Sequence, residues 1–125
     1  MTAPPAKRIR VLLVDDEPAI LRALEREVSV FAEVVTCLTV TEAIDLVGRE
    51  TFDAIVADLR LPDRWGDELL ARAAAHAPAT RRLLFTADDD PQRTVRELID
   101  RGVVQDWYQK PYTDGLLNAL RLLAE

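Results

Sequence analysis

Polar side chains stand at the ends of four short apolar runs in this 125-residue chain. Asp15 and Asp16 follow the first of these runs, Asp58 and Thr86 close two later ones, and Lys110 follows the last. A carboxylate buried without partners would cost several kcal/mol, so we expect cations or hydrogen-bond donors to converge on these acids. Three acids placed close together repel one another unless a cation lies between them.

These residue types suit magnesium-dependent phosphoryl transfer. Oxygen ligands with open positions for water and phosphate are those that Mg²⁺ prefers. The lysine offers a point charge for a phosphoryl oxygen, and the threonine hydroxyl offers a donor. Neither histidine nor cysteine stands at these positions, which disfavours a zinc site or a Cys-His nucleophile. The natural nucleophile is a carboxylate oxygen, which can take a phosphoryl group and hold it as an acyl phosphate.

The apolar residues predict five strands that alternate with five helices. We expect strands at residues 9–14, 34–38, 54–58, 82–86 and 103–109, and helices near residues 18–28, 40–50, 67–76, 91–101 and 116–123. This alternation implies right-handed crossovers and a parallel α/β sheet covered by helices on both faces. Functional groups of such a sheet gather at the carboxyl ends of the strands, where the polar residues stand. Acids follow the first strand in place of the glycines of a dinucleotide-binding fingerprint.

Length and composition indicate one globular domain. The chain is 49% hydrophobic and 30% charged, the balance of an ordinary soluble protein. Its net charge of -6 disfavours direct nucleic-acid binding and anionic membrane surfaces, and no apolar run approaches the roughly 20 residues of a membrane span. The single cysteine, Cys37, agrees with a reducing compartment, so we expect a cytoplasmic protein. Residues 1–8 are expected to form a flexible arm before a domain at residues 9–125.

The chain resembles the receiver domains of two-component response regulators over residues 9 to about 124. The resemblance rests on the polar residues at the strand ends, together with Leu61-Pro62, Gly66, Ala87 and Pro111. Each of these is a weak signal alone, but they occur together and in order. The resemblance implies a flavodoxin-like, doubly wound (βα)5 parallel sheet with strand order 2-1-3-4-5 in a three-layer α/β/α architecture.

The resemblance also implies a role for each acid. Asp58 would accept a phosphoryl group from a sensor histidine kinase or a histidine phosphotransfer protein. Mg²⁺ would be held by Asp16, by Asp58 and by the backbone carbonyl of Arg60, with Asp15 acting largely through water. The domain would thus be a phosphoacceptor in signalling rather than an enzyme with a separate substrate.

The remaining matched residues would carry the response. Lys110 would pair with the phosphoryl oxygens, Thr86 would move to donate a hydrogen bond to them, and the Ala87 amide would assist. The change would reach the surface of the fourth helix, fifth strand and fifth helix, which would contact an output domain or effector and could support a homodimer. Trp107 stands where similar receivers carry a Tyr or Phe that turns inward, and Tyr108 is the neighbouring candidate.

Two positions beside the acceptor are candidates for tuning hydrolysis of the acyl phosphate. Arg60 lies two residues after Asp58, and Asp88 lies two residues after Thr86. We hypothesise that Arg60 and Asp88 form an ion pair across the mouth of the site and hinder the attacking water. The simpler interpretation of Asp88 is a solvated loop acid. Trp65 fits either loop packing or contact with a partner.

Three other interpretations compete with this one. The acids after the first strand could simply cap a helix, but the other strand-end residues argue against that. A phosphohydrolase with an aspartate nucleophile would need a second acid at the position of Arg60, which is a cation. A degenerate receiver would bind a partner without phosphorylation, whereas Asp16, Asp58 and Lys110 are all present here.

Overall fold

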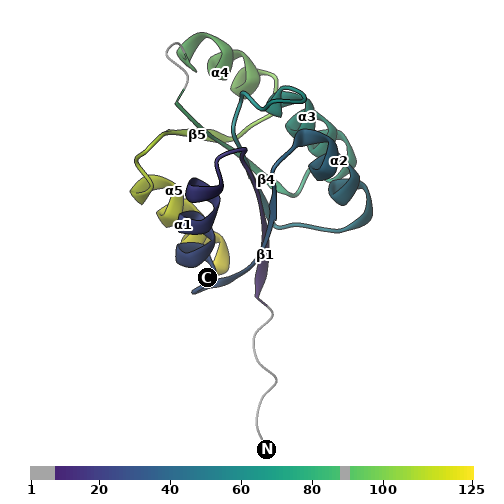
Figure 1. Ribbon diagram of the computed structural model, residues 1–125. Coiled ribbons are helices and arrows are strands. Elements are labelled where there is room, and N and C mark those ends of the chain that lie inside the picture. The colour runs from purple at the N-terminus through teal and green to yellow at the C-terminus, as the bar shows by residue number, and fades with distance from the viewer. Residues whose placement is uncertain (1–7, 88–90) are drawn as a thin grey trace, which may run out of the picture.

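The computed structural model describes residues 8–87 and 91–125 and shows five strands alternating with five helices (Figure 1). The strands are β1 (Ile9–Val14), β2 (Ala32–Cys37), β3 (Ala54–Ala57), β4 (Arg81–Thr86) and β5 (Asp106–Gln109). The helices are α1 (Pro18–Val28), α2 (Val40–Arg49), α3 (Gly66–His76), α4 (Pro91–Asp100) and α5 (Asp114–Ala124). Apart from Arg8, the predicted arm at residues 1–8 lies outside the described residues.

All five strands are parallel and lie in the order β2-β1-β3-β4-β5. This confirms the predicted flavodoxin-like, doubly wound sheet. The strand order reverses at β1, which pairs with β2 on one side and with β3 on the other. The carboxyl ends of β1 and β3 therefore lie next to each other, at the point where doubly wound sheets bind ligands.

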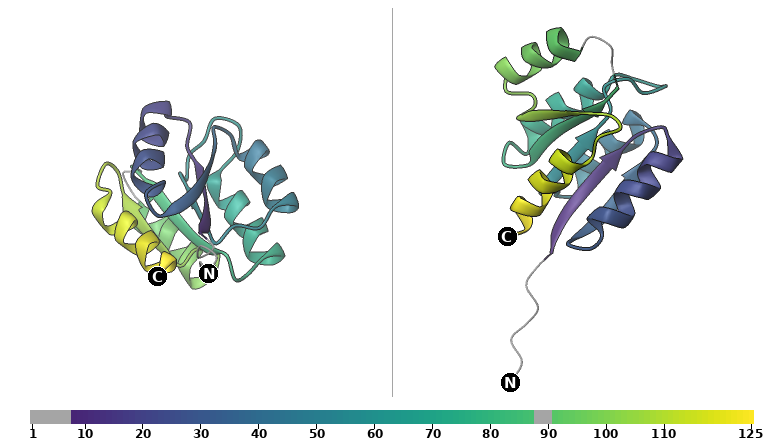
Figure 2. Two further views of the ribbon diagram at one scale, coloured as in Figure 1. Left: turned by 90° about the horizontal axis from the view of Figure 1, so that it is seen from below. Right: turned by 90° about the vertical axis from the view of Figure 1, so that its left-hand side faces the viewer.

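Helices cover both faces of the sheet and produce three layers. Helices α1 and α5 lie side by side on one face, and α2 and α3 lie on the other (Figures 1 and 2). Because side chains alternate along a strand, Leu12 packs into the core beneath α2, α3 and α4, whereas Leu13 packs into the core beneath α1 and α5. Among the described residues, no helix combines the length and the apolar character needed to cross a bilayer.

The predicted starts of two strands were wrong by two or three residues, whereas β3 and β4 differ from the expected bounds by a single residue. Strand β5 begins at Asp106 rather than residue 103, because the amides of Val103 and Gly102 close the end of α4 instead of joining the sheet. Val103 N donates to Leu98 O (2.9 Å) and Gly102 N donates to Ile99 O (3.0 Å). Gly102 has a φ of 74°, which completes a Schellman ending.

The other correction concerns β2, which begins at Ala32 rather than residue 34 and ends at Cys37. Ala32 and Glu33 join the sheet because they pair with Ile9 and Arg10 at the start of β1. An alternating pattern that begins with Ala and Glu carries little signal for a strand, so the sequence alone placed the start too late.

Candidate functional site

Lys110 and two aspartates form the buried centre of the site. Lys110 Nζ lies 2.8 Å from Asp15 Oδ2 and 2.8 Å from Asp58 Oδ2, and all three side chains are buried. Glu17, which the sequence analysis did not select, also approaches Lys110 Nζ at 3.6 Å. Its position in the acidic turn after β1 was the available signal. The structure therefore brings together residues that are up to 95 positions apart in the chain.

The backbone fixes these side chains because the sheet hydrogen bonds continue one residue past the strands. Asp58 N donates to Val14 O (3.1 Å), and Lys110 N donates to Thr86 O (2.9 Å). Asp15 N similarly donates to Cys37 O (3.1 Å). Each of these residues thus lies directly after its strand, and its amide still bonds to the neighbouring strand in the register of the sheet.

Asp16 completes a group of three acids. One carboxylate oxygen from each of Asp15, Asp16 and Asp58 can be chosen so that all lie within 4.8 Å of one another. Asp16 is exposed, while the other two are buried. Asp15 Oδ1 accepts a hydrogen bond from Glu17 N (3.0 Å) and its Oδ2 faces Lys110. An oxygen-only group with one solvent-exposed member fits Mg²⁺, which keeps several waters.

Excess negative charge dominates the electrostatics of this group. Burial raises the pKa of Asp15, and its hydrogen bond with Lys110 offsets this only in part. Burial lowers the pKa of Lys110, but the hydrogen bonds with Asp15 and Asp58 outweigh burial, so the net pKa is raised. Both groups therefore hold their protons more tightly than usual. Three carboxylates surround one ammonium, and a divalent cation would relieve the imbalance.

The loop between β3 and α3 folds back onto Asp58. Gly66 N donates to Leu59 O (2.8 Å), and a Cβ added at Gly66 would lie 1.9 Å from Asp58 O. Only glycine allows this close approach, which explains its place in the sequence. Arg60 and Trp65 form an isolated antiparallel bridge, and the Arg60 guanidinium lies 5.6 Å from the centre of the Trp65 ring.

Trp107 and Tyr108 lie on opposite faces of the sheet. Trp107 packs against the core beneath α4, and Tyr108 packs against the core beneath α5, where its hydroxyl lies 3.3 Å from Asp106 Oδ2. Trp107 pairs with Leu84, and Thr86 is two residues further along β4, so Thr86 and Trp107 share a face. This places Trp107, rather than Tyr108, on the face of the buried threonine.

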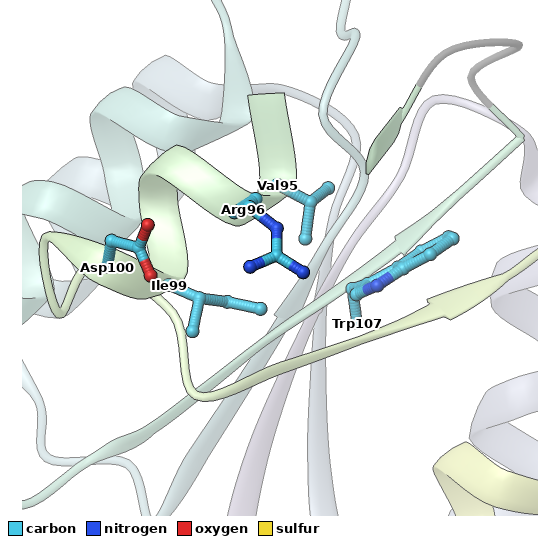
Figure 3. A pocket seen from close by; sticks show the side chains of 5 residues that line it. All are labelled: Val95, Arg96, Ile99, Asp100 and Trp107. Atoms are coloured by element: carbon cyan, nitrogen blue, oxygen red, sulfur yellow. The ribbon is translucent and has the colours of Figure 1, made fainter. Parts of the chain in front are cut away.

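An open cavity of about 460 Å³ separates α4 from β5. It is lined by Val95, Arg96, Ile99, Asp100 and Trp107. Figure 3 shows Val95, Arg96 and Ile99 projecting from α4 toward the side of β5 that carries Trp107. The ring of Trp107 therefore has space beside it within the surface that the resemblance implicates in signalling.

One predicted ion pair lies outside the described residues, and one contact that was not predicted, made by Asp63, is present. Asp88 lies outside the described residues, and with it the predicted ion pair to Arg60. Ala87 lies directly after β4 and is exposed. Asp63, which the sequence analysis did not select, contacts the first turn of α2. No pattern in the sequence links two residues so far apart.

Comparison with known proteins gives consistent matches. A family model described as the response regulator receiver domain matches residues 11–121. Response regulator protein PilR of Pseudomonas aeruginosa is 32% identical over 114 residues, which make up 90% of this chain and 25% of PilR. Transcriptional regulatory protein KdpE of Mycobacterium tuberculosis is 32% identical over 113 residues, which make up 89% of this chain and 49% of KdpE. The chain spans a quarter to about half of the length of these curated relatives.

Solved structures give the same match. The signal receiver domain of an HD domain-containing protein from Pseudomonas fluorescens Pf-5 superposes with a TM-score of 0.85 and 30% identity, covering 98% of this chain and 91% of that chain. A CheY-like response regulator receiver domain protein from Methanospirillum hungatei JF-1 superposes with a TM-score of 0.83 and 26% identity, covering 94% of both chains.

Proposed function

The chain belongs to the response regulator receiver domain family, and we propose that Asp58 accepts a phosphoryl group from a histidine kinase or histidine phosphotransfer protein in a Mg²⁺-dependent reaction. The observation that carries the proposal is the contact of Lys110 Nζ with Asp58 Oδ2 at 2.8 Å, beside two further carboxylates. A carboxylate poised between a cation and a metal-binding group is equipped for nucleophilic attack on phosphorus.

The proposed transfer is a direct displacement at phosphorus. An Asp58 carboxylate oxygen forms the new P–O bond, the P–N bond to the donor imidazole breaks, and the imidazole leaves with the bonding electron pair and takes up a proton. Lys110 stabilises the charge on the phosphoryl oxygens because it is already within 2.8 Å of Asp58. Mg²⁺, held by Asp16, Asp58 and the Arg60 carbonyl, would neutralise phosphoryl charge as well.

Phosphorylation would then be read at the surface of α4, β5 and α5. Thr86 is buried at the end of β4 and shares a face with Trp107, so a movement of Thr86 toward a phosphoryl oxygen would free space for the indole. The Ala87 amide would donate to the same group. The surface would contact an output domain, an effector or a second copy of the chain.

Arg60 and Asp88 keep their proposed role in tuning hydrolysis of the acyl phosphate. The Arg60 guanidinium stacks on Trp65, beside the residue that would carry the phosphate. A degenerate receiver is the less favoured function, because the acidic group and Lys110 are complete and in contact.

Intact mass spectrometry after incubation with acetyl phosphate and Mg²⁺ tests the proposal. We expect the wild type to gain one phosphoryl group and Asp58→Asn to gain none, because an amide cannot act as the nucleophile. Asp45→Asn is the matched control, since Asp45 pairs with Arg49 on the exposed side of α2, and it should behave as wild type. Equal modification of Asp58→Asn, or no modification of the wild type, would contradict the proposal.

A further inference from the structure

Asp63 joins two elements that the sequence separates. It lies in the loop between β3 and α3, and its carboxylate accepts three hydrogen bonds from the start of α2. Val40 N donates to Oδ1 at 3.1 Å, while Thr41 N and Thr41 Oγ1 donate to Oδ2 at 2.8 and 2.7 Å. Both oxygens of one side chain are thus committed to a neighbouring helix.

Helix α2 has a cap of its own and does not depend on Asp63 to begin. Thr39 Oγ1 accepts a hydrogen bond from Glu42 N (3.2 Å), as an N-cap residue does. Asp63 satisfies the two amides before Glu42, which the Thr39 side chain does not reach. The added effect of Asp63 is therefore on the loop, which it ties to a rigid element.

The contact persists across physiological pH. The hydrogen bond from the Thr41 hydroxyl lowers the pKa of Asp63 to about 2, with the amides of Thr41 and Val40 contributing in the same direction. The carboxylate is therefore ionised at neutral pH, and its three donors remain engaged.

The segment that connects Asp63 to the backbone carbonyl of Arg60 is short and has little conformational freedom. Only Leu61 and Pro62 lie between them; the proline ring restricts its own φ, and Leu61 packs against the core beneath α2 and α3. The base of the loop is closed by the hydrogen bond between Gly66 and Leu59. A shift of Asp63 would therefore be passed to the carbonyl of Arg60.

We infer that Asp63 is a positioning residue, which holds the carbonyl of Arg60 in place for Mg²⁺ by tying its loop to α2. The inference rests on the proposed function, because it assumes that this carbonyl is a ligand. Outer partners of metal ligands commonly change affinity by about 10- to 100-fold when they are removed. A tie one loop away from the ligand should act at the lower end of that range.

Calorimetric titration with MgCl₂ alone, without a phosphodonor, measures this effect. Asp63→Ala should weaken Mg²⁺ binding about tenfold. Thr41→Val keeps all charges but removes one of the three donors, so it should weaken binding by about two- to threefold. Asp45→Ala removes the same charge from the exposed side of α2 and should bind as wild type. Urea unfolding of each variant separates lost affinity from lost stability.

Hydrogen exchange without Mg²⁺ gives a readout that is independent of the metal. The amide of Gly66, which closes the loop, should exchange faster in Asp63→Ala and Thr41→Val than in Asp45→Ala. Wild-type affinity and wild-type exchange in both Asp63→Ala and Thr41→Val would overturn the inference. If the wild type bound no Mg²⁺, the proposed function would fail, and the exchange rates alone would decide whether the tie exists.

Discussion

Lys110 and Arg82 are both buried cations, but they lie at opposite ends of the same sheet. Lys110 follows the carboxyl end of β5 and is 9% exposed, whereas Arg82 lies near the start of β4 and is 5% exposed. Lys110 is surrounded by carboxylates. Within residues 8–87 and 91–125, the hydrogen bonds of the Arg82 side chain go to backbone carbonyls.

The carbonyls around Arg82 come from two separate turns. Its guanidinium donates to Val103 O (2.9 Å), Pro78 O (3.0 Å), Thr80 O (2.7 Å) and Gly102 O (3.1 Å). Gly102 and Val103 belong to the turn that ends α4, and Pro78 and Thr80 precede β4. Burial lowers the pKa of Arg82, yet a guanidinium stays charged in proteins. Arg82 therefore joins the two turns through hydrogen bonds to uncharged backbone groups.

The difference teaches how one fold separates signalling from stability. Carboxylates change their charge with pH and can exchange an ammonium for a metal ion or a phosphoryl group. Backbone carbonyls do not titrate, and the four carbonyls around Arg82 already accept hydrogen bonds from its guanidinium. We therefore expect the start of the sheet to respond little to what binds at the carboxyl ends of the strands. We expect substitutions of the two cations to affect different properties, and three comparisons test this.

Lys110→Met should have the largest effect, on phosphorylation. Loss of one charged donor at the reacting group typically slows a reaction by about 10²- to 10³-fold, so the rate of phosphorylation by acetyl phosphate should fall by about that factor. Phosphorylation rates at saturating Mg²⁺ measure it. Arg81→Met is the control, because Arg81 is an exposed cation at the start of β4. A loss of less than about tenfold would show that Lys110 has little contact with the transferred group.

Arg82→Met should have the next largest effect, on stability. Removing the guanidinium leaves several buried carbonyls without donors, and we expect the free energy of unfolding to fall by about 2 kcal/mol. Urea unfolding measures this, again with Arg81→Met as the matched control. The phosphorylation rate per folded molecule should stay as in the wild type. A phosphorylation defect as large as that of Lys110→Met would contradict the separation of the two ends.

The sequence predicted the carboxyl end of the sheet well because its signals are local. Asp58 follows four apolar residues that could only be a buried strand, and the residue after such a strand lies at the sheet edge. The same argument placed Lys110 and Thr86. Parallel strand ends share one edge, so local signals were enough to gather residues from distant parts of the chain.

The amino end and the loop ties could not be predicted in this way. Arg82 was predicted only as the first residue of a strand. Its contacts were missed because its partners are backbone carbonyls, which every residue carries. Asp63 was overlooked for the same reason, since two of its three donors are backbone groups of Val40 and Thr41. Contacts of side chains with a distant backbone leave no pattern of residue types in the sequence.

The smallest of the three effects is a difference in pH dependence between the two cation variants. The pKa of Asp15 is already raised by burial, and the hydrogen bond with Lys110 limits that rise. Lys110→Met removes this limit and raises the pKa of Asp15 in the native state further. In the unfolded state Asp15 has its ordinary pKa of 3.8, so above that pH the native state keeps a proton that the unfolded state has released. Stability then falls as pH rises from about 4 toward 7, since the native state binds more protons in that interval.

The stability deficit of Lys110→Met relative to wild type should therefore be smallest near pH 4 and grow by about 1 kcal/mol by pH 7. The stability deficit of Arg82→Met should stay constant over this range. The guanidinium that it removes is charged at every pH between 4 and 7, and the carbonyls that it leaves do not titrate. Urea unfolding in the presence of a chelator, at several pH values, measures both curves. If the two stability deficits had the same pH dependence, the carboxylates around Lys110 would have moved toward solvent when it was removed. The two ends of the sheet would then differ in the position of their cations but not in their response to pH.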